Sequence, residues 1–247
     1  MTQALANTKR YLSQAIGALL DLIYPPHCVA CDAPGSWFCA ECEAAIARIP
    51  ESICHHCGRP YSGEALCVAC RGDESSLDAM RAFALHEEPI SHAVHALKYD
   101  GLRVLAPQLG AYLAEAYVHY GLRAQVIIPV PLHHSRQRQR GYNQAYLLAR
   151  ELSRLVEVDV DRRLLKRTRK TRSQVGLSGG ERWDNMTAAF RCAGDDLGGM
   201  RVLLIDDVMT TGATLESCAK ALREAGAGHV QALTLTQAPH GPRARHQ

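Results

Sequence analysis

Eight of the ten cysteines lie between positions 28 and 70, where they form four Cys-x-x-Cys pairs. Two intervening residues allow a tight turn to present both thiolates to one ion, and two such pairs complete the tetrahedral shell of a structural Zn²⁺. The sequence therefore predicts two structural zinc ions. The predicted ligands are Cys28, Cys31, Cys39, Cys42, Cys54, Cys57, Cys67 and Cys70. A sequential pairing of the first four and the last four fits this spacing, and so does an interleaved one.

A disulfide framework is the other chemistry open to clustered cysteines, and it requires an oxidising compartment. Residues 11–24 follow two basic residues as in a signal peptide, but polar residues interrupt them and no small-residue cleavage site follows. No stretch has the about 18 uninterrupted apolar residues of a membrane span. We therefore expect a cytoplasmic protein that is not an integral membrane protein. We interpret residues 1–24 as an amphipathic helical lead.

The predicted zinc ions are expected to build structure, because four thiolates leave no coordination position for water or substrate. The segment that holds them, residues 25–72, has few large apolar side chains and could not fold on packing alone. On the sequence alone we expect zinc removal to unfold this module and to leave the rest of the chain folded.

The overall composition is that of a globular protein, with 47% hydrophobic and 21% charged residues. This excludes a collagen-like or disordered chain, and 6% aromatic residues argue against a binding surface dominated by stacking. The formal net charge of +3 is too small for nucleic-acid binding by bulk charge. Any such binding must rest on local basic patches.

A second motif with chemical potential is the run VLLIDDVMTTGAT at residues 202–214. An apolar strand ends in two acids and passes through a Thr/Gly turn into a helix, and such a turn offers N–H groups and a helix dipole to a phosphate. Asp206 and Asp207 would repel that phosphate, so they suit ribose hydroxyls or a hydrated Mg²⁺. A 5-phosphorylated ribose combines these groups. The alternative is a polar strand-to-helix turn in which a threonine caps the helix.

The elements that position this motif alternate between apolar strands and helices, which is typical of an α/β fold with a parallel sheet flanked by helices. We predict strands over residues 80–86, 125–129, 190–192, 202–205 and 229–236, and helices over residues 89–99, 104–120, 145–156 and 215–222. The predicted organisation is a helical lead (1–24), a small zinc module (25–72), an α/β domain (77–238) and a disordered tail (239–247).

Two basic segments lie within the α/β region. Arg136, Arg138 and Arg140 alternate in what we predict to be a polar loop, and Lys170 and Arg172 belong to a run over residues 162–172 that contains no acid. Arginine forks suit phosphate oxygens, so these segments could hold a pyrophosphate or a nucleic-acid backbone. A solvated basic loop without a ligand is the third interpretation, and the residues alone leave all three open.

Several segments resemble known families. The run at residues 202–214 resembles the phosphoribosyl pyrophosphate (PRPP) motif of type I phosphoribosyltransferases. LLDLIYPPHCVAC (19–31), IPVPLHHSRQRQRGYNQAYLLAR (128–150) and SQVGLSGGERWDNMTAAF (173–190) are similar to segments of the ComF/GntX family. Proteins of that family join a double zinc ribbon to a phosphoribosyltransferase-like domain. The resemblance extends from about residue 19 to residue 236.

The resemblance implies a role for individual residues, although it identifies no catalytic residue. Asp206 and Asp207 would contact the ribose of PRPP, bound with Mg²⁺. The implied cradle for the 5-phosphate consists of Thr210, Thr211, Gly212, Ala213 and Thr214. Val130, Pro131 and Leu132 would form the pyrophosphate loop, where Val130–Pro131 could supply a cis bond, and Lys170 or Arg172 would stabilise the leaving pyrophosphate. Lys98 and Tyr99, in HALKYDG, also match the family pattern.

The function implied by the resemblance is PRPP binding, combined with a role in competence-related DNA uptake. The implied partners are single-stranded DNA and a competence helicase, and an active protein would be a phosphoribosyltransferase. Two alternatives stay open. One is a nucleobase salvage phosphoribosyltransferase, for which no base-recognition element is recognisable. The other is a non-catalytic adaptor that senses PRPP.

Overall fold

The computed structural model describes residues 25–72, 74–168, 189–194 and 196–239. The predicted helical lead and nearly all of the predicted tail lie outside the described residues. Among the described residues, no helix has both the length and the apolar character needed to cross a membrane.

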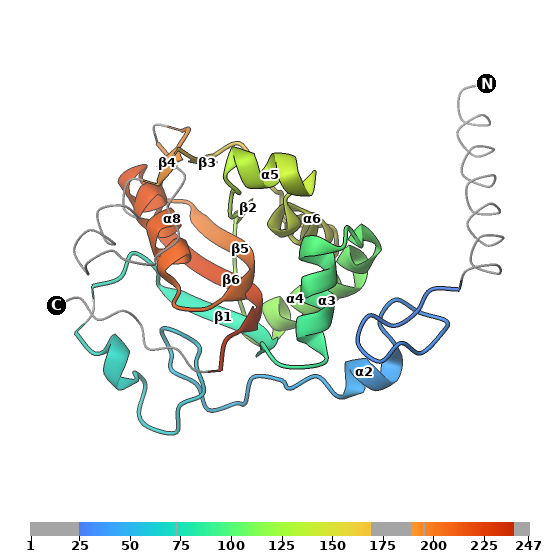
Figure 1. The fold of residues 1–247 in the computed structure, drawn as a ribbon. Coiled ribbons are helices and arrows are strands. Elements are labelled where there is room, and N and C mark those ends of the chain that lie inside the picture. Colours follow the sequence, from blue (N-terminus) through green and yellow to red (C-terminus); the bar gives the residue numbers. More distant parts are fainter. Residues whose placement is uncertain (1–24, 73, 169–188, 195, 240–247) are drawn as a thin grey trace, which may run out of the picture.

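A four-stranded parallel sheet forms the centre of the molecule (Figure 1). Its strands, in spatial order, are β1 (Ala79–Leu85), β6 (His229–Gln237), β5 (Arg201–Met209) and β2 (Val126–Pro129). All three pairings are parallel, so the carboxyl ends of the strands meet at one edge. The four predicted strands of this sheet are confirmed, and β5 continues beyond the predicted end to include both acids.

Helices cover both faces of the sheet, as expected for an α/β fold. The helices of the first face are α3 (Ile90–Tyr99), α4 (Ala106–His119) and α6 (Gln144–Val156). They enclose one apolar core with Leu203 and Ile205 of β5. On the second face, α8 (Ala213–Glu224) encloses another core with Val202 and Leu204. The alternation of β5 residues between the two cores is the period-two pattern of a fully buried strand.

Two elements in the basic segments differ from the prediction. Residues 134–140 are not a loop but a short helix, α5 (His134–Arg140), which His133 caps and Gly141 ends in a left-handed conformation. No apolar side chain marks a buried face on this helix, so its sequence lacks helical periodicity. The second difference is β3 (Leu165–Arg167), which pairs antiparallel with β4 (Phe190–Cys192) outside the main sheet. The predicted strand at 190–192 is thus confirmed, whereas β3 was not predicted.

The cysteine-rich segment packs against the open edge of β1. It contains one short helix, α2 (Ala40–Ala44), and one 3-10 turn, η1 (Val68–Cys70). Met80 N–H donates to the carbonyl of His56 (2.7 Å), and Leu85 N–H donates to that of Ala47 (2.8 Å). Edge strands expose unpaired backbone groups, and here the cysteine-rich segment supplies the missing acceptors.

Candidate functional site

The eight clustered cysteines form two separate groups of four. Within each group the ligand sulfurs all lie within 4.8 Å of one another. The pairing is therefore sequential, and the interleaved pairing is wrong. The first cluster consists of Cys28, Cys31, Cys39 and Cys42, and the second consists of Cys54, Cys57, Cys67 and Cys70.

The geometry of both clusters fits zinc. Sγ–Sγ distances are 3.7 Å for Cys28–Cys42, 3.6 Å for Cys31–Cys39 and 3.8 Å for Cys57–Cys67. A regular tetrahedron with Zn–S bonds of about 2.3 Å has sulfurs about 3.8 Å apart, whereas a disulfide requires about 2.05 Å. The two clusters are thus consistent with two structural zinc sites, as predicted.

Backbone donors favour the thiolate, the form that binds metal, at one cysteine of each cluster, whereas burial, followed by neighbouring cysteines, raises the pKa of Cys42 and Cys57. Burial opposes ionisation of Cys54, but N–H groups led by that of Cys67 outweigh it and lower the pKa of Cys54 to about 6. The Cys67 N–H lies 3.3 Å from the sulfur of Cys54. In the first cluster, burial of Cys28 is likewise outweighed, chiefly by the Cys39 N–H, and its pKa falls to about 6.

The predicted phosphate cradle lies at the carboxyl end of β5, between that strand and the start of α8. Gly212 is the residue before α8, and its φ of 82° places it in the left-handed region. A side chain there would also press on Met80, because a Cβ would lie 3.1 Å from the Met80 sulfur. Thr211 Oγ1 accepts from Ala213 N–H (3.4 Å), which tightens the turn. The cradle of residues 210–214 is partly exposed, so a ligand can reach it.

The two acids that precede the cradle point to opposite faces of the sheet. Side chains of a strand alternate between the two faces of the sheet, so Asp207 lies on the same face as Ile205. Its Oδ1 forms an ion pair with Lys98 Nζ of α3 at 2.7 Å. Asp206 lies on the α8 face, where burial and then the charge of Asp206 raise the pKa of Cys218. The sequence predicted both acids at this strand end but not that they face apart.

Asp207 is the more deeply placed acid, with 4% of its surface exposed. Its Oδ1 pairs with Lys98, whereas its Oδ2 has no hydrogen-bond partner among the described residues. Such an atom is costly unless something satisfies it, so this oxygen fits a ribose hydroxyl or a metal-bound water.

Lys98 was not among the predicted site residues, although the HALKYDG segment that contains it matches the pattern of the ComF/GntX family. Next to it, His86 Nδ1 lies 2.8 Å from Thr236 Oγ1, and that hydroxyl donates to the Asp207 carbonyl at 3.5 Å. Burial, and then the charge of Lys98, lowers the pKa of His86, which favours the neutral ring. A polar cluster therefore surrounds Asp207, with contributions from α3, from the residue that follows β1 and from β6.

The predicted pyrophosphate loop adjoins the acids, because β2 pairs with β5 and Pro129 lies opposite Ile205. Val130 N–H donates to the Ile205 carbonyl (2.9 Å), and the Asn143 side-chain amide donates to the Val130 carbonyl (3.0 Å). The structure thus brings Val130, Pro131 and Leu132 to the same sheet edge as the cradle. The prediction of a cis bond at Val130–Pro131 is wrong: among the described residues the cis bond joins Glu88 to Pro89, and residue 130 continues the pairing of its strand.

The predicted basic contacts separate into three groups. Arg136 and Arg138 are exposed on α5. Arg140 bonds to Gln144 and lies over the Tyr99 ring, with 5.1 Å between its guanidinium carbon and the ring centroid. Lys170 and Arg172 lie outside the described residues.

The sequence did not single out Arg167 on β3 as a site residue. Burial lowers the pKa of Arg167, and the neighbouring Arg136 lowers it further. The charge of Asp206 acts in the opposite direction. Arg167 therefore lies within electrostatic reach of both α5 and Asp206.

Asp206 makes the stability of the fold depend on pH. Burial and the charge of Asp207 raise the pKa of Asp206 from 3.8 to about 8, against the opposing effect of Lys98 and Arg167. The unfolded chain therefore ionises first, so this group destabilises the fold increasingly between about pH 4 and pH 8. We expect Asp206→Asn to gain stability relative to the unmodified protein as pH rises through that window.

Urea unfolding at pH 5 and pH 8.5 measures this difference. Asp196→Asn is the matched control, because this exposed acid caps a turn at the opposite end of α8, where Oδ1 accepts from Gly198 N–H at 2.7 Å. Parallel stability profiles for Asp206→Asn and the unmodified protein would contradict the raised pKa.

Comparison with known proteins agrees with this architecture. Residues 19–71 match the family model described as double zinc ribbon domain, and residues 138–246 match that of the phosphoribosyl transferase domain. Competence protein F of Haemophilus influenzae is 36% identical over 208 residues, which cover 81% of this chain and 90% of that protein. DNA utilization protein YhgH of Escherichia coli O157:H7 is 33% identical over 220 residues, which cover 85% of this chain and 96% of that protein.

Among solved structures, purine phosphoribosyltransferase from Pyrococcus horikoshii is 20% identical with a TM-score of 0.36, covering 57% of this chain and 80% of that one. The family assignment rests on the two domain matches and on the relatives named above. The chain belongs to the ComF/YhgH family, in which a double zinc ribbon precedes a phosphoribosyltransferase domain.

Proposed function

We propose that this protein binds PRPP with Mg²⁺ at the carboxyl end of β5 and acts with single-stranded DNA in DNA uptake, in the cytoplasm. The observation that carries the first half is the pairing of two features. A partly exposed cradle at the start of α8 offers N–H groups and the positive end of a helix dipole to a phosphate. Directly before it, Asp206 and the unpartnered Oδ2 of Asp207 offer acceptors for ribose hydroxyls.

Each part of PRPP then has a complementary group. The 5-phosphate lies on residues 210–214, the ribose hydroxyls on the acids, and the pyrophosphate at residues 130–132. Because the two acids face apart, one ion would not contact both; Asp207, with its unpartnered Oδ2, is the residue that would hold a hydrated Mg²⁺, which would supply neutralising charge for the pyrophosphate. In turnover, the bond from C1 of the ribose to pyrophosphate breaks while a bond from C1 to an acceptor forms. Arg136, which interacts electrostatically with Arg167, follows residues 130–132 closely in the chain, and the charge of these two arginines would stabilise the departing group.

The role in DNA uptake is supported by two observations. Relatives that match this chain over 90% and 96% of their own length are named competence protein F and DNA utilization protein. In addition, Arg136 and Arg138 are exposed on α5, which gives a local basic patch beside the ribose site. Guanidinium groups bind the phosphates of a nucleic-acid backbone as readily as a pyrophosphate.

A single design tests both halves. The purified protein is titrated with PRPP and Mg²⁺ by calorimetry and with labelled single-stranded DNA by fluorescence anisotropy. At pH 8.5, where the Asp206 carboxyl is ionised, we expect Asp206→Asn to weaken PRPP binding at least about tenfold, because charge-assisted hydrogen bonds to the ribose are removed, and to leave DNA affinity unchanged. Asp196→Asn is again the matched control and should change neither. Absence of PRPP binding by the unmodified protein would overturn the first half.

The second half is tested by replacing Arg136 and Arg138 with glutamine. We expect weaker DNA binding and a salt dependence whose slope falls by about 0.7 for each DNA phosphate that the variant no longer neutralises. Arg154→Gln is the matched control, since this exposed arginine on α6 pairs with Glu151 at 3.2 Å. If the variant with glutamine at positions 136 and 138 binds DNA as tightly as Arg154→Gln does, the proposal that α5 contacts DNA is wrong. Pyrophosphate release that requires a nucleobase would instead identify a salvage enzyme.

A further inference from the structure

Arg59 links the second zinc cluster to the phosphate cradle. Its Nη2 donates to the carbonyl of Thr210 at 2.7 Å, across 151 positions of sequence. Arg59 also belongs to the turn that carries two ligands of the cluster, because Cys54 N–H donates to the Arg59 carbonyl at 2.9 Å. A side chain fixed by the second zinc cluster therefore touches the first residue of the cradle.

The turn that carries Arg59 is docked firmly on the sheet. Three consecutive carbonyls of this turn accept hydrogen bonds from the α/β domain: His55 from Arg81 (2.9 Å), His56 from Met80 N–H (2.7 Å) and Cys57 from the Gln237 side chain (3.2 Å). Gly58, with a φ of 67°, lies so close to Met80 that a Cβ would collide with the Met80 carbonyl oxygen. The position of the turn on β1 is thus set by contacts on each of the four residues before Arg59.

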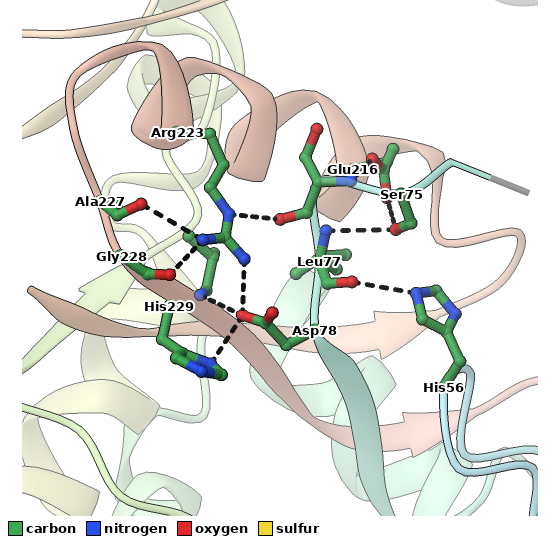
Figure 2. A network of polar contacts seen from close by, with 11 residues as sticks. His56, Ser75, Leu77, Asp78, Glu216, Arg223, Ala227, Gly228 and His229 are labelled. Atoms are coloured by element: carbon green, nitrogen blue, oxygen red, sulfur yellow. Dashed lines mark hydrogen bonds and ion pairs between the residues drawn. The ribbon is translucent and has the colours of Figure 1, made fainter. Parts of the chain in front are cut away.

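A second set of contacts ties the following linker to α8, the helix that begins at the cradle (Figure 2). Ser75 Oγ and Ser76 N–H both donate to the Glu216 carboxylate at 2.6 Å. At the other end of α8, Arg223 donates to Asp78 at 2.7 Å and to the Ser76 carbonyl at 3.0 Å. The linker is thus bonded to α8 and the turn that carries Arg59 is bonded to β1 and β6, so the Arg59–Thr210 contact is one of several that hold the cysteine-rich segment on the α/β domain.

The contact has a directional consequence at the cradle. A trans peptide unit is planar, with its C=O and N–H pointing in opposite directions. When Arg59 fixes the carbonyl of Thr210, the N–H of Thr211 must point away from the ribbon. Thr211 N–H is one of the groups proposed to receive the 5-phosphate, so Arg59 orients a donor of the site without belonging to the phosphoribosyltransferase domain.

We propose that Arg59 is a positioning residue for the phosphate cradle, and that the second zinc cluster thereby sets the affinity for the 5-phosphate of the ligand. This inference rests on the proposed function, since it concerns the same site. It assigns a part in ligand binding to the second cluster. The chain that follows the first cluster instead bonds to the carboxyl-terminal residue of β1, where Leu85 N–H donates to the Ala47 carbonyl.

The test compares Arg59→Ala with Arg71→Ala. Arg71 is the matched control because it is another exposed arginine of the second ribbon, and its side chain donates to Leu66 and Tyr61 within the ribbon. Ribose 5-phosphate is the probe, measured by calorimetry beside PRPP with Mg²⁺. We expect Arg59→Ala to bind ribose 5-phosphate about tenfold more weakly, with a shifted Thr211 amide resonance, and Arg71→Ala to match the unmodified protein.

Metal analysis of every variant separates positioning from damage to the ribbon, because the inference requires Arg59→Ala to retain two zinc ions. If Arg59→Ala loses zinc, Arg59→Lys decides instead. Its ammonium lacks the planar, fixed donor geometry of the guanidinium that reaches the Thr210 carbonyl, so this variant should bind ribose 5-phosphate about threefold more weakly. Unchanged affinity and an unshifted Thr211 amide in a zinc-loaded variant overturn the inference. Failure of the unmodified protein to bind either ligand is a different outcome, which overturns the proposed function itself.

Discussion

Lys98→Met is expected to lower the free energy of unfolding by about 3 kcal/mol, because it leaves the carboxylate of Asp207 buried without its partner. The Lys98 and Asp207 side chains are 19% and 5% exposed, and the Nζ–Oδ1 distance is 2.7 Å. Methionine preserves the length and apolar stem of lysine, so the loss reports the missing charge. Urea unfolding at neutral pH measures it.

A second variant and a control show whether the effect belongs to this pair. Lys98→Met combined with Asp207→Asn should recover much of the lost stability, because the unpaired charge is removed as well. Glu115→Gln is the control, since Glu115 pairs with Arg48 at the surface, where side chains are 59% and 42% exposed, and it should cost less than about 1 kcal/mol. Equal losses for Lys98→Met and Glu115→Gln would contradict a buried ion pair.

Zinc removal is the second change with a large expected effect, and the structure alters what we expect of it. Cys54, Cys57 and Cys70 lie in the same apolar core as Met80 of β1 and Leu222 of α8. Structural zinc sites contribute roughly 10–16 kcal/mol of apparent binding free energy at neutral pH. Because ribbon and sheet share this core, chelation should destabilise the α/β domain too, rather than leave it unaffected as the sequence alone suggested.

Hydrogen exchange after chelation provides the measurement. The amides of Met80 and Leu85, whose acceptors lie in the cysteine-rich segment, should lose protection first, and the central strand β5 should follow at lower denaturant than in the zinc-loaded protein. Cys54→Ser should bind one zinc instead of two and melt earlier. Cys192→Ser is the matched control, since this cysteine lies on β4 outside both clusters. Unaltered protection of Met80 without zinc would refute the shared core.

The sequence predicted those parts of the molecule whose determinants are local. Cys-x-x-Cys spacing, the strand-turn-helix pattern at 202–214 and the helical periodicity of α6 all depend on neighbours within a few positions. The helix α5 was not predicted because its residues form no apolar face. The strand β3 was not predicted because it lies in a run of basic residues without an alternating apolar pattern. In both cases pairing or capping decided the structure, rather than periodicity.

The contacts that fix the site could not be predicted, because they join distant parts of the chain. Lys98 meets Asp207 only after α3 packs on the sheet, and Arg59 meets Thr210 only after the ribbon docks on β1. The sequence also could not show that the two acids face apart, since that depends on β5 continuing as a strand through both of them. Only the resemblance to a known family pointed to residues of such contacts, as it did for Lys98 in the HALKYDG segment.

The metal-dependent covering of the outermost strand has a consequence for newly synthesised chains. The Met80 amide of β1 finds its acceptor, the His56 carbonyl, in a turn between two cysteines of the second cluster, and we expect that turn to depend on a bound ion. A chain that has not acquired zinc presents that strand uncovered, and an uncovered strand is a template on which other chains can add. We therefore expect metal supply to govern aggregation as well as folding, so expression in zinc-poor medium should yield insoluble protein even where the ribose site is intact.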